Sequence, residues 1–229
     1  MSRVPAGWAD ADPQFDEVGF DLSAAMLAPA FEGEPPKKLT PRQQERLTSV
    51  LRTVLRLTNK GGYEAVKMRD TVEAGIALGT IYRFFGSRDF LVFRATSAWF
   101  EWAAVRSLPR GGTKDFRRRS MYQFERLTAQ WAAHPRVVEA WLRSATSDDP
   151  LVQELQRTYR PSLFAAHQWA PMDDLDPEYA AKLRTMIEAH AFGGMVRWVH
   201  GQRTLAELKT DFANLLDLVF DPPLYRAAD

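Results

Sequence analysis

The stretch GGYEAVKMRDTVEAGIALGTIYRFFGSRDFL, residues 61–91, decides the fold. Glycines divide it into short segments of about residues 67–74 and 78–84, with a turn at Gly75 between them. Glycine commonly ends helices, because it tolerates backbone angles that other residues avoid. The pattern therefore predicts short helices in a compact tri-helical unit of the kind that reads DNA.

Strong helix signals lie on both sides of this stretch. Thr40, Pro41 and Gln43 provide an N-cap, a first-turn proline and a capping box, and Thr204 with Glu207 forms a second box. Beyond the quoted stretch the sequence predicts only long helices, near residues 87–107, 113–133, 135–147, 149–169, 177–201 and 204–220. No segment alternates like a strand, so we expect an all-α fold.

Charge is segregated along the chain, although the net charge is only +1. Residues 1–36 contain seven acidic residues and one basic residue, whereas residues 37–94 contain twelve basic and five acidic residues. A basic segment in an otherwise balanced chain suits a polyanion such as DNA. The alternative is a solvated basic helix face.

The N-terminus and the composition bear on location. The chain has no cysteine and no apolar run of the roughly 18 residues that a membrane helix needs. Its N-terminus lacks the basic and apolar regions of a signal peptide. We therefore expect a cytoplasmic protein without membrane contact.

The order of these motifs resembles the helix-turn-helix of TetR-family transcriptional regulators. The elements that carry the resemblance are Gly62-Tyr63, Arg69-Asp70, Ala74-Gly75, Gly79-Thr80-Ile81-Tyr82 and Ser87-Arg88. GGYEAV, LGTIYRFF and the Trp-rich penultimate helix are most similar to the KstR subgroup. The resemblance implies a three-helix DNA-binding domain at 39–86 and a helical ligand-binding and dimerisation domain at 87–229. Residues 1–38 have the composition of a flexible acidic arm.

One departure precedes the recognition helix. RDTVEAGIALG, residues 69–79, is one residue shorter than the usual family spacing. Either Asp70 and Thr71 shift onto the buried face of the preceding helix, or the turn tightens and that helix ends early. We expect the tighter turn, because it keeps Val72 buried.

The resemblance implies that the helix beginning near Leu78 enters a major groove. Gly79 lets its backbone approach DNA, while Thr80 and Tyr82 offer hydroxyl groups to phosphates. Arg88 lies at a helix N-terminus, which also favours an anion. The candidate DNA-binding residues are Lys67, Arg69, Ala77, Leu78, Gly79, Thr80, Tyr82, Arg83, Phe84 and Arg88.

The same helix contains apolar residues of two kinds. Ile81 and Phe85 are four positions apart, so we expect them in the core. Phe84 stands where the family often has a polar aromatic residue. Ala77 and Leu78 offer only apolar contacts, for example to thymine methyl groups, which leaves sequence specificity open.

The second half is rich in aromatic residues, with six tryptophans between residues 99 and 198. Aromatic residues at helical spacing usually form a core, but this number also suits a cavity for a large apolar ligand. The candidate ligand-binding residues are Trp102, Phe124, Trp131, Trp141, Phe164 and Phe192. Gly193-Gly194 inside a helix suggests a close helix crossing or room for a pocket. The candidate dimer-interface residues are Met195, Val199, Phe212, Leu215, Leu216 and Val219.

Enzyme signals are absent from the sequence. The four histidines are dispersed, and no catalytic, phosphate-binding or metal-binding motif occurs. We expect no catalytic residue, metal or cofactor. The leading hypothesis is a homodimeric repressor of a near-palindromic operator, released by a hydrophobic effector such as a lipid, steroid or acyl-CoA. The alternative is a TetR-like helical dimer with impaired DNA reading that binds a ligand or a protein.

Overall fold

The computed structural model describes residues 15–20, 22, 39–74, 76–108, 115–159 and 176–220. Every regular element in these residues is helical, which confirms the predicted all-α class. None of the described helices combines the length and apolarity needed to cross a membrane. The chain divides into two compact units, one of residues 3–103 with 133–163 and one built mainly from 104–132 with 164–229.

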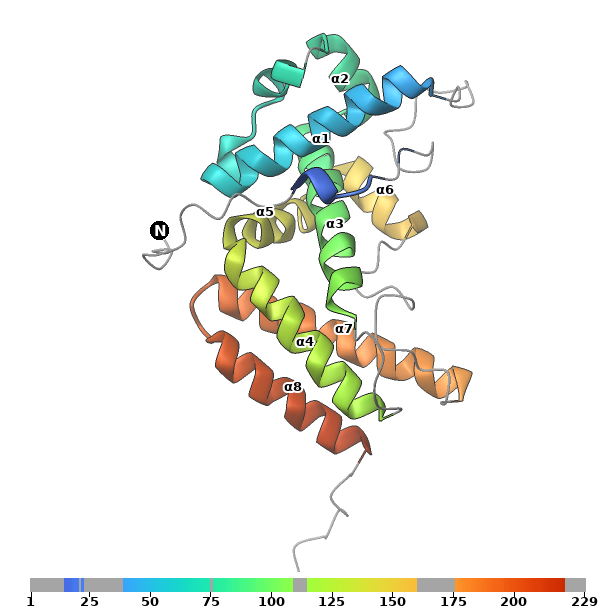
Figure 1. Ribbon diagram of the computed structural model, residues 1–229, viewed down its shortest axis with the longest axis vertical. Coiled ribbons are helices and arrows are strands. Elements are labelled where there is room, and N and C mark those ends of the chain that lie inside the picture. Colours follow the sequence, from blue (N-terminus) through green and yellow to red (C-terminus); the bar gives the residue numbers. More distant parts are fainter. Residues whose placement is uncertain are drawn as a thin grey trace, which may run out of the picture. The chain divides into compact units, whose positions relative to one another are not determined.

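The first unit contains the stretch that decides the fold (Figure 1). Its elements are α1 (Pro41–Gly61), η3 (Tyr63–Ala65), η4 (Met68–Ala74), α2 (Leu78–Phe85), most of α3 (Arg88–Ser107), α5 (Pro135–Ala145) and α6 (Pro150–Tyr159). Helix α1 packs against η3, η4 and α5. The predicted boundary after residue 86 falls inside this unit, so the functional division there stays a prediction.

Helix α1 begins and ends where local chemistry predicts. Gln43 N donates to Thr40 Oγ1 at 3.3 Å and Thr40 N donates to Gln43 Oε1 at 2.8 Å, which completes the predicted capping box. The helix ends at Gly61, and Gly62 adopts a φ of 72° that favours glycine. Its predicted apolar stripe is buried at Leu47, Val50, Leu51, Val54 and Leu55.

A short piece of the acidic arm docks against α1. In η1 (Phe15–Glu17) and the next residue, Phe15 and Val18 are buried. The Asp16 carboxylate pairs with Arg56 at 2.6 Å, and its carbonyl accepts from Arg52 at 2.7 Å. Apolar burial and an ion pair therefore both hold residues 15–18 against α1.

The segment before the recognition helix is a 3-10 helix. In η4, Met68 and Thr71 are buried three positions apart, which matches three residues per turn. Thr71 Oγ1 donates to Met68 O at 2.6 Å. Val72 is 37% exposed, so the expectation of a turn that keeps it buried is wrong. Of the alternative shift of Asp70 and Thr71, the structure shows only the Thr71 part, because Thr71 is buried while the Asp70 side chain is 39% exposed and pairs with Arg69.

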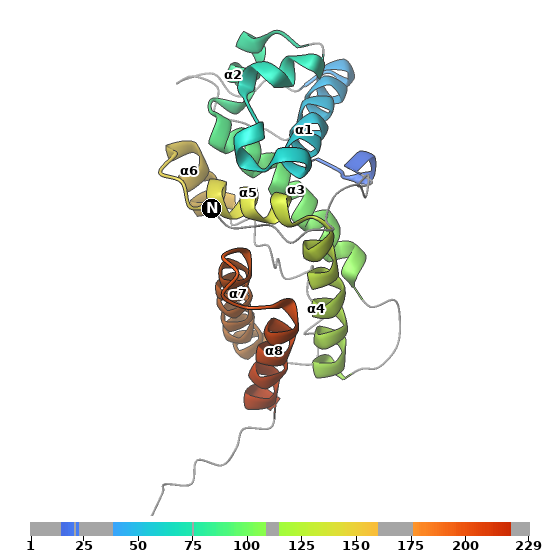
Figure 2. The same cartoon turned by 90° about the vertical axis from the view of Figure 1, so that its left-hand side faces the viewer.

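The second unit contains almost all of α4 (Phe116–Ala133), together with α7 (Pro177–Val199) and α8 (Leu205–Phe220). Helices α7 and α8 lie side by side in an antiparallel pair (Figures 1 and 2). A Cβ atom added at Gly194 would lie 3.2 Å from Leu208 Cδ2. The predicted close crossing therefore explains Gly194, whereas Gly193 has nothing within 4 Å.

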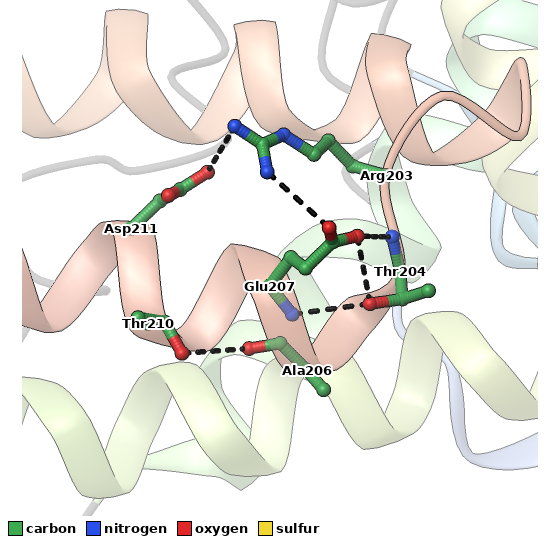
Figure 3. A network of polar contacts seen from close by, with 6 residues as sticks. All are labelled: Arg203, Thr204, Ala206, Glu207, Thr210 and Asp211. Atoms are coloured by element: carbon green, nitrogen blue, oxygen red, sulfur yellow. Dashed lines mark hydrogen bonds and ion pairs between the residues drawn. The ribbon is translucent and has the colours of Figure 1, made fainter.

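The second predicted capping box begins α8 (Figure 3). Glu207 N donates to Thr204 Oγ1 at 3.2 Å, and Thr204 N donates to Glu207 Oε2 at 2.7 Å. Arg203 pairs with Glu207 at 3.3 Å and with Asp211 at 3.8 Å. Both helix starts that the sequence marks with a capping box are confirmed.

Candidate functional site

Helix α2 has one buried and one exposed face. Ile81 and Phe85 have no exposed surface, which confirms their predicted place in the core. Tyr82 is 48% exposed, and Leu78 is 36% exposed. Packing therefore holds the helix by one face and leaves the other available to a partner.

The first turn of α2 is small and open. Ala77 is the N-cap residue and makes no side-chain capping bond, while backbone N–H groups of Thr80 and Ile81 donate to its carbonyl. Gly79 is exposed, and a Cβ atom added to it would have nothing within 4 Å. Packing within the protein thus does not require glycine at this position. A close approach to a partner remains a reason for it.

The remaining exposed candidates in this segment are basic or aromatic. Lys67 is exposed, and Arg69 is exposed while pairing with Asp70 at 3.5 Å. The Arg83 guanidinium carbon lies 5.0 Å from the centroid of the half-buried Phe84 ring. These cations lie at the surface, where a polyanion can reach them.

Arg88 has a partner within the protein. Ser87 caps α3 by accepting from Phe90 N at 3.0 Å. The Arg88 guanidinium donates to Glu64 Oε2 at 3.1 Å, and its central carbon lies 4.1 Å from the Tyr63 ring centroid. Arg88, the predicted phosphate anchor, is therefore held by the carboxylate of Glu64 within the same protein.

A second arginine joins the same carboxylate from α5. Arg143 pairs with Glu64 at 2.5 Å, and its guanidinium carbon lies 4.5 Å from the Tyr63 ring centroid. The hydrogen bond from Arg88, followed by the charges of Arg143 and Arg88, lowers the pKa of Glu64. The Tyr63 hydroxyl donates a hydrogen bond to the Asp89 carboxylate. We call Tyr63, Glu64, Arg88, Asp89 and Arg143 the α5 polar cluster.

Sequence reasoning missed three members of the α5 polar cluster, which are Glu64, Asp89 and Arg143. Glu64 directly follows the Gly62-Tyr63 motif, but no sequence pattern marks Glu64 itself as a functional residue. Arg143 lies in a helix far downstream, and no local signal relates it to residues 63–64. Only the packing of α5 against η3 brings these groups together.

The candidate ligand residues fall into both units. Trp141 packs between aromatic neighbours, with ring centroids 6.3 Å from Phe93 and 5.1 Å from Phe100, and its Nε1 donates to Ser97 at 3.1 Å. Trp102 is half-buried in the same unit. The hydrogen bond to Ser97 satisfies the buried indole, so core packing alone accounts for Trp141.

The other candidate ligand residues belong to the second unit. Phe124 stacks on Phe212 with centroids 4.1 Å apart, and Trp131 meets Phe124 edge-on at 6.1 Å. Trp131 also stacks on Trp198 at 6.4 Å. Phe192 is half-buried. Phe164 lies outside the described residues, so a shared ligand site stays a prediction.

The candidate dimer residues divide by burial. Met195, Phe212 and Leu216 have no exposed surface, so in this conformation they pack the protomer and cannot contact a second copy directly. Val199, Leu215 and Val219 are partly exposed and keep some surface. The most exposed large apolar side chains on α7 and α8 are instead Met186 at 53% and Leu218 at 59%.

Comparisons with known proteins agree with this architecture. No family model matches the chain. The HTH-type transcriptional repressor KstR of Rhodococcus jostii is 30% identical over 184 residues, which cover 78% of this chain and 82% of that protein. The KstR repressors of Mycolicibacterium smegmatis and Mycobacterium tuberculosis are 45% and 41% identical over 60 and 59 residues, 29% and 27% of their lengths.

A solved structure has the same fold. The crystal structure of a TetR transcriptional regulator from Rhodococcus sp. RHA1 superposes with a TM-score of 0.64 at 18% identity. The match covers 79% of this chain and 98% of the other. The match to the relative from Rhodococcus jostii spans 184 residues and therefore extends far beyond the helix-turn-helix segment. The chain therefore belongs to the TetR family of transcriptional regulators, among its KstR-like members.

Proposed function

We propose that this protein is a ligand-responsive transcriptional repressor that binds a near-palindromic operator as a homodimer. The observation that carries the proposal is the two-faced helix α2, whose Ile81 and Phe85 are buried while Tyr82 and Arg83 face solvent. A helix held this way suits the major groove. KstR relatives, which are named as repressors, support the same function.

The operator should carry two half-sites. In a two-fold dimer the two α2 helices would enter successive major grooves, about 34–36 Å apart. Partly exposed apolar residues on α7 and α8 suit a contact between protomers, with Leu215 and Val219 among the original candidates. The proposed place of action is the cytoplasm, where the operator is accessible.

A hydrophobic effector is the proposed signal. Aromatic residues of the second unit, such as Phe124, Trp131 and the half-buried Phe192, suit a large apolar molecule, for example a lipid, a steroid or an acyl-CoA. Its binding would change the spacing of the two α2 helices and so lower the affinity of the dimer for its operator. A coupling of about 1–3 kcal/mol would change operator affinity about 5- to 150-fold.

A selection from random duplex DNA tests the proposal. We expect an enriched palindrome whose affinity falls steeply with salt, because each protein–phosphate contact releases counterions. Arg83→Ala should weaken binding, whereas Val105→Ala, at an exposed position on α3, should not. A selection that enriches no palindrome even at low salt overturns the proposal.

One observation favours the alternative function. The segment that precedes α2 is wound as a 3-10 helix and exposes Val72. If this changes the presentation of α2, the protein would be a ligand-binding or protein-interaction module. The same selection distinguishes the two functions, since the module would bind an apolar ligand and enrich no DNA sequence.

A further inference from the structure

We propose that Leu78, with Ala77 beside it, reads thymine C5-methyl groups in the operator. The inference rests on the proposed function, because it concerns how the same helix chooses its sequence. It assigns specificity to apolar contact at the start of α2 and leaves anchoring to the hydroxyl and cationic groups around it.

The first turn of α2 carries no exposed hydrogen-bonding side chain. It begins with Ala77, Leu78 and Gly79, all exposed, and the hydroxyl-bearing Thr80 is partly buried. The N-terminal part of a recognition helix is the part that reaches base edges. Leu78 is therefore the largest side chain that this turn can present to a base.

The polar side chains of the exposed face lie later in α2. Tyr82 is one turn after Leu78, and the Arg83 guanidinium carbon lies 5.0 Å from the Phe84 ring centroid. Later positions on a recognition helix are better placed for the DNA backbone than for base edges. We assign these groups to phosphate contacts, which set position without reading sequence.

The exposed side chain of Leu78 suits an apolar partner. Its side chain is 36% exposed, on a segment where residues 37–94 contain twelve basic and five acidic residues. An apolar protein partner would offer no counter-charge to the exposed cations of this segment, such as Lys67 and Arg83. Duplex DNA supplies phosphates for those cations, and thymine presents a methyl group in its major groove. Charge complementarity thus favours duplex DNA as the partner, and the apolar side chain of Leu78 favours thymine among its bases.

Gly79 makes the contact sterically possible. The open space at its missing Cβ means that no neighbour within the protein limits an approach on that side. A DNA groove can therefore come close to the backbone of the first turn, which brings the short side chain of Ala77 within reach as well. Both residues then contact apolar surface on the bases.

Replacing thymine by deoxyuridine tests the inference, because it removes only the methyl group. We would take the duplex enriched by the selection, replace its thymines one at a time, and measure the dissociation constant by fluorescence anisotropy. Losing one buried methyl group should weaken binding about fourfold, the change expected for about 0.8 kcal/mol. The wild-type protein should show this loss at one or more thymines in each half-site.

A double-mutant cycle links the methyl group to the residue. Leu78→Ala should bind the thymine duplex more weakly and lose the penalty for deoxyuridine. Val105→Ala, which removes an exposed aliphatic side chain elsewhere, should keep both the affinity and the penalty. Leu78 is partly exposed, so the variant should fold, and thermal unfolding checks this.

The outcomes are distinct. Absence of any enriched duplex overturns the proposed function and this inference together. A selected duplex that tolerates deoxyuridine at every position overturns the inference alone. The inference also fails if Leu78→Ala retains the full deoxyuridine penalty, because the methyl group would then be read elsewhere.

Discussion

Tyr63 combines a packed ring with a titratable hydroxyl. Burial, followed by its hydrogen bond to Asp89, raises the pKa of Tyr63 to about 12. Because an unfolded tyrosine has a pKa of about 10, the folded state keeps its proton longer. Stability should therefore be lost as the pH rises from about 10 to 12.

Tyrosinate absorbance measures this effect directly. Tyr63 should titrate about two units above an ordinary tyrosine. Tyr63→Phe should remove that late step. If the substitution removes a step near pH 10 instead, the hydroxyl is not held as described.

His134 should make stability depend on pH on the acid side. Burial lowers the pKa of His134, whose Nδ1 lies 3.2 Å from Asn59 Oδ1. The unfolded state binds a proton more readily, so stability should fall as the pH drops below about 6.5. His190, also buried enough to lower its pKa, contributes in the same direction.

The measurement is the urea midpoint between pH 7.5 and 5.5. His134→Gln keeps a polar side chain near Asn59 but cannot take up a proton. Its midpoint should change less with pH than that of the wild type. An identical slope for both proteins contradicts the role given to His134.

Most helices are predictable element by element, because their boundaries depend on short-range chemistry. The capping boxes at Thr40 and Thr204 and the proline at the start of α7 are local signals that the structure reproduces. The 3-10 winding of η4 cannot be predicted from local signals, because it depends on the distance that the segment must cover before α2. Seven residues at about 2.0 Å each reach about 14 Å, against about 12 Å for eight α-helical residues. The shorter segment can thus cover the usual distance.

The α8 capping box gives a prediction with a matched control in the same helix (Figure 3). Thr204→Ala removes the acceptor for Glu207 N and should cost about 1 kcal/mol. Thr210 Oγ1 only donates to the carbonyl of Ala206, so Thr210→Ala should stay within about 0.5 kcal/mol. Thermal unfolding of both variants measures the difference. Equal losses would mean that the cap does not stabilise α8.

The whole molecule shows what local patterns leave out. Aromatic composition predicts an apolar interior but not its division, and Trp141 and Phe124 belong to different compact units. Helical periodicity likewise marks Met195 and Phe212 as apolar, yet cannot tell a protomer core from a dimer interface. Both are buried within the protomer, Met195 on α7 and Phe212 on α8, where Phe212 stacks on Phe124 of α4. Long-range packing therefore fixes the roles that sequence alone leaves open.

The α5 polar cluster links a downstream helix to the proposed DNA contact. Glu64 holds Arg88 and Arg143 together, so its carboxylate competes with a DNA phosphate for Arg88. Glu64→Gln removes that negative charge while keeping a hydrogen-bond acceptor. We expect Arg88 to become available and operator binding to tighten.

Salt dependence identifies the cause of that tightening. In the proposed homodimer each protomer gains one phosphate contact. The slope of log affinity against log salt should therefore become steeper by about 1.8, which is about 0.9 for each contact. Glu154→Gln, which breaks an exposed ion pair with Arg157 on α6, is the matched control and should leave the slope unchanged. A Glu64→Gln slope equal to that of this control would show that Arg88 reaches no phosphate even when Glu64 no longer holds it.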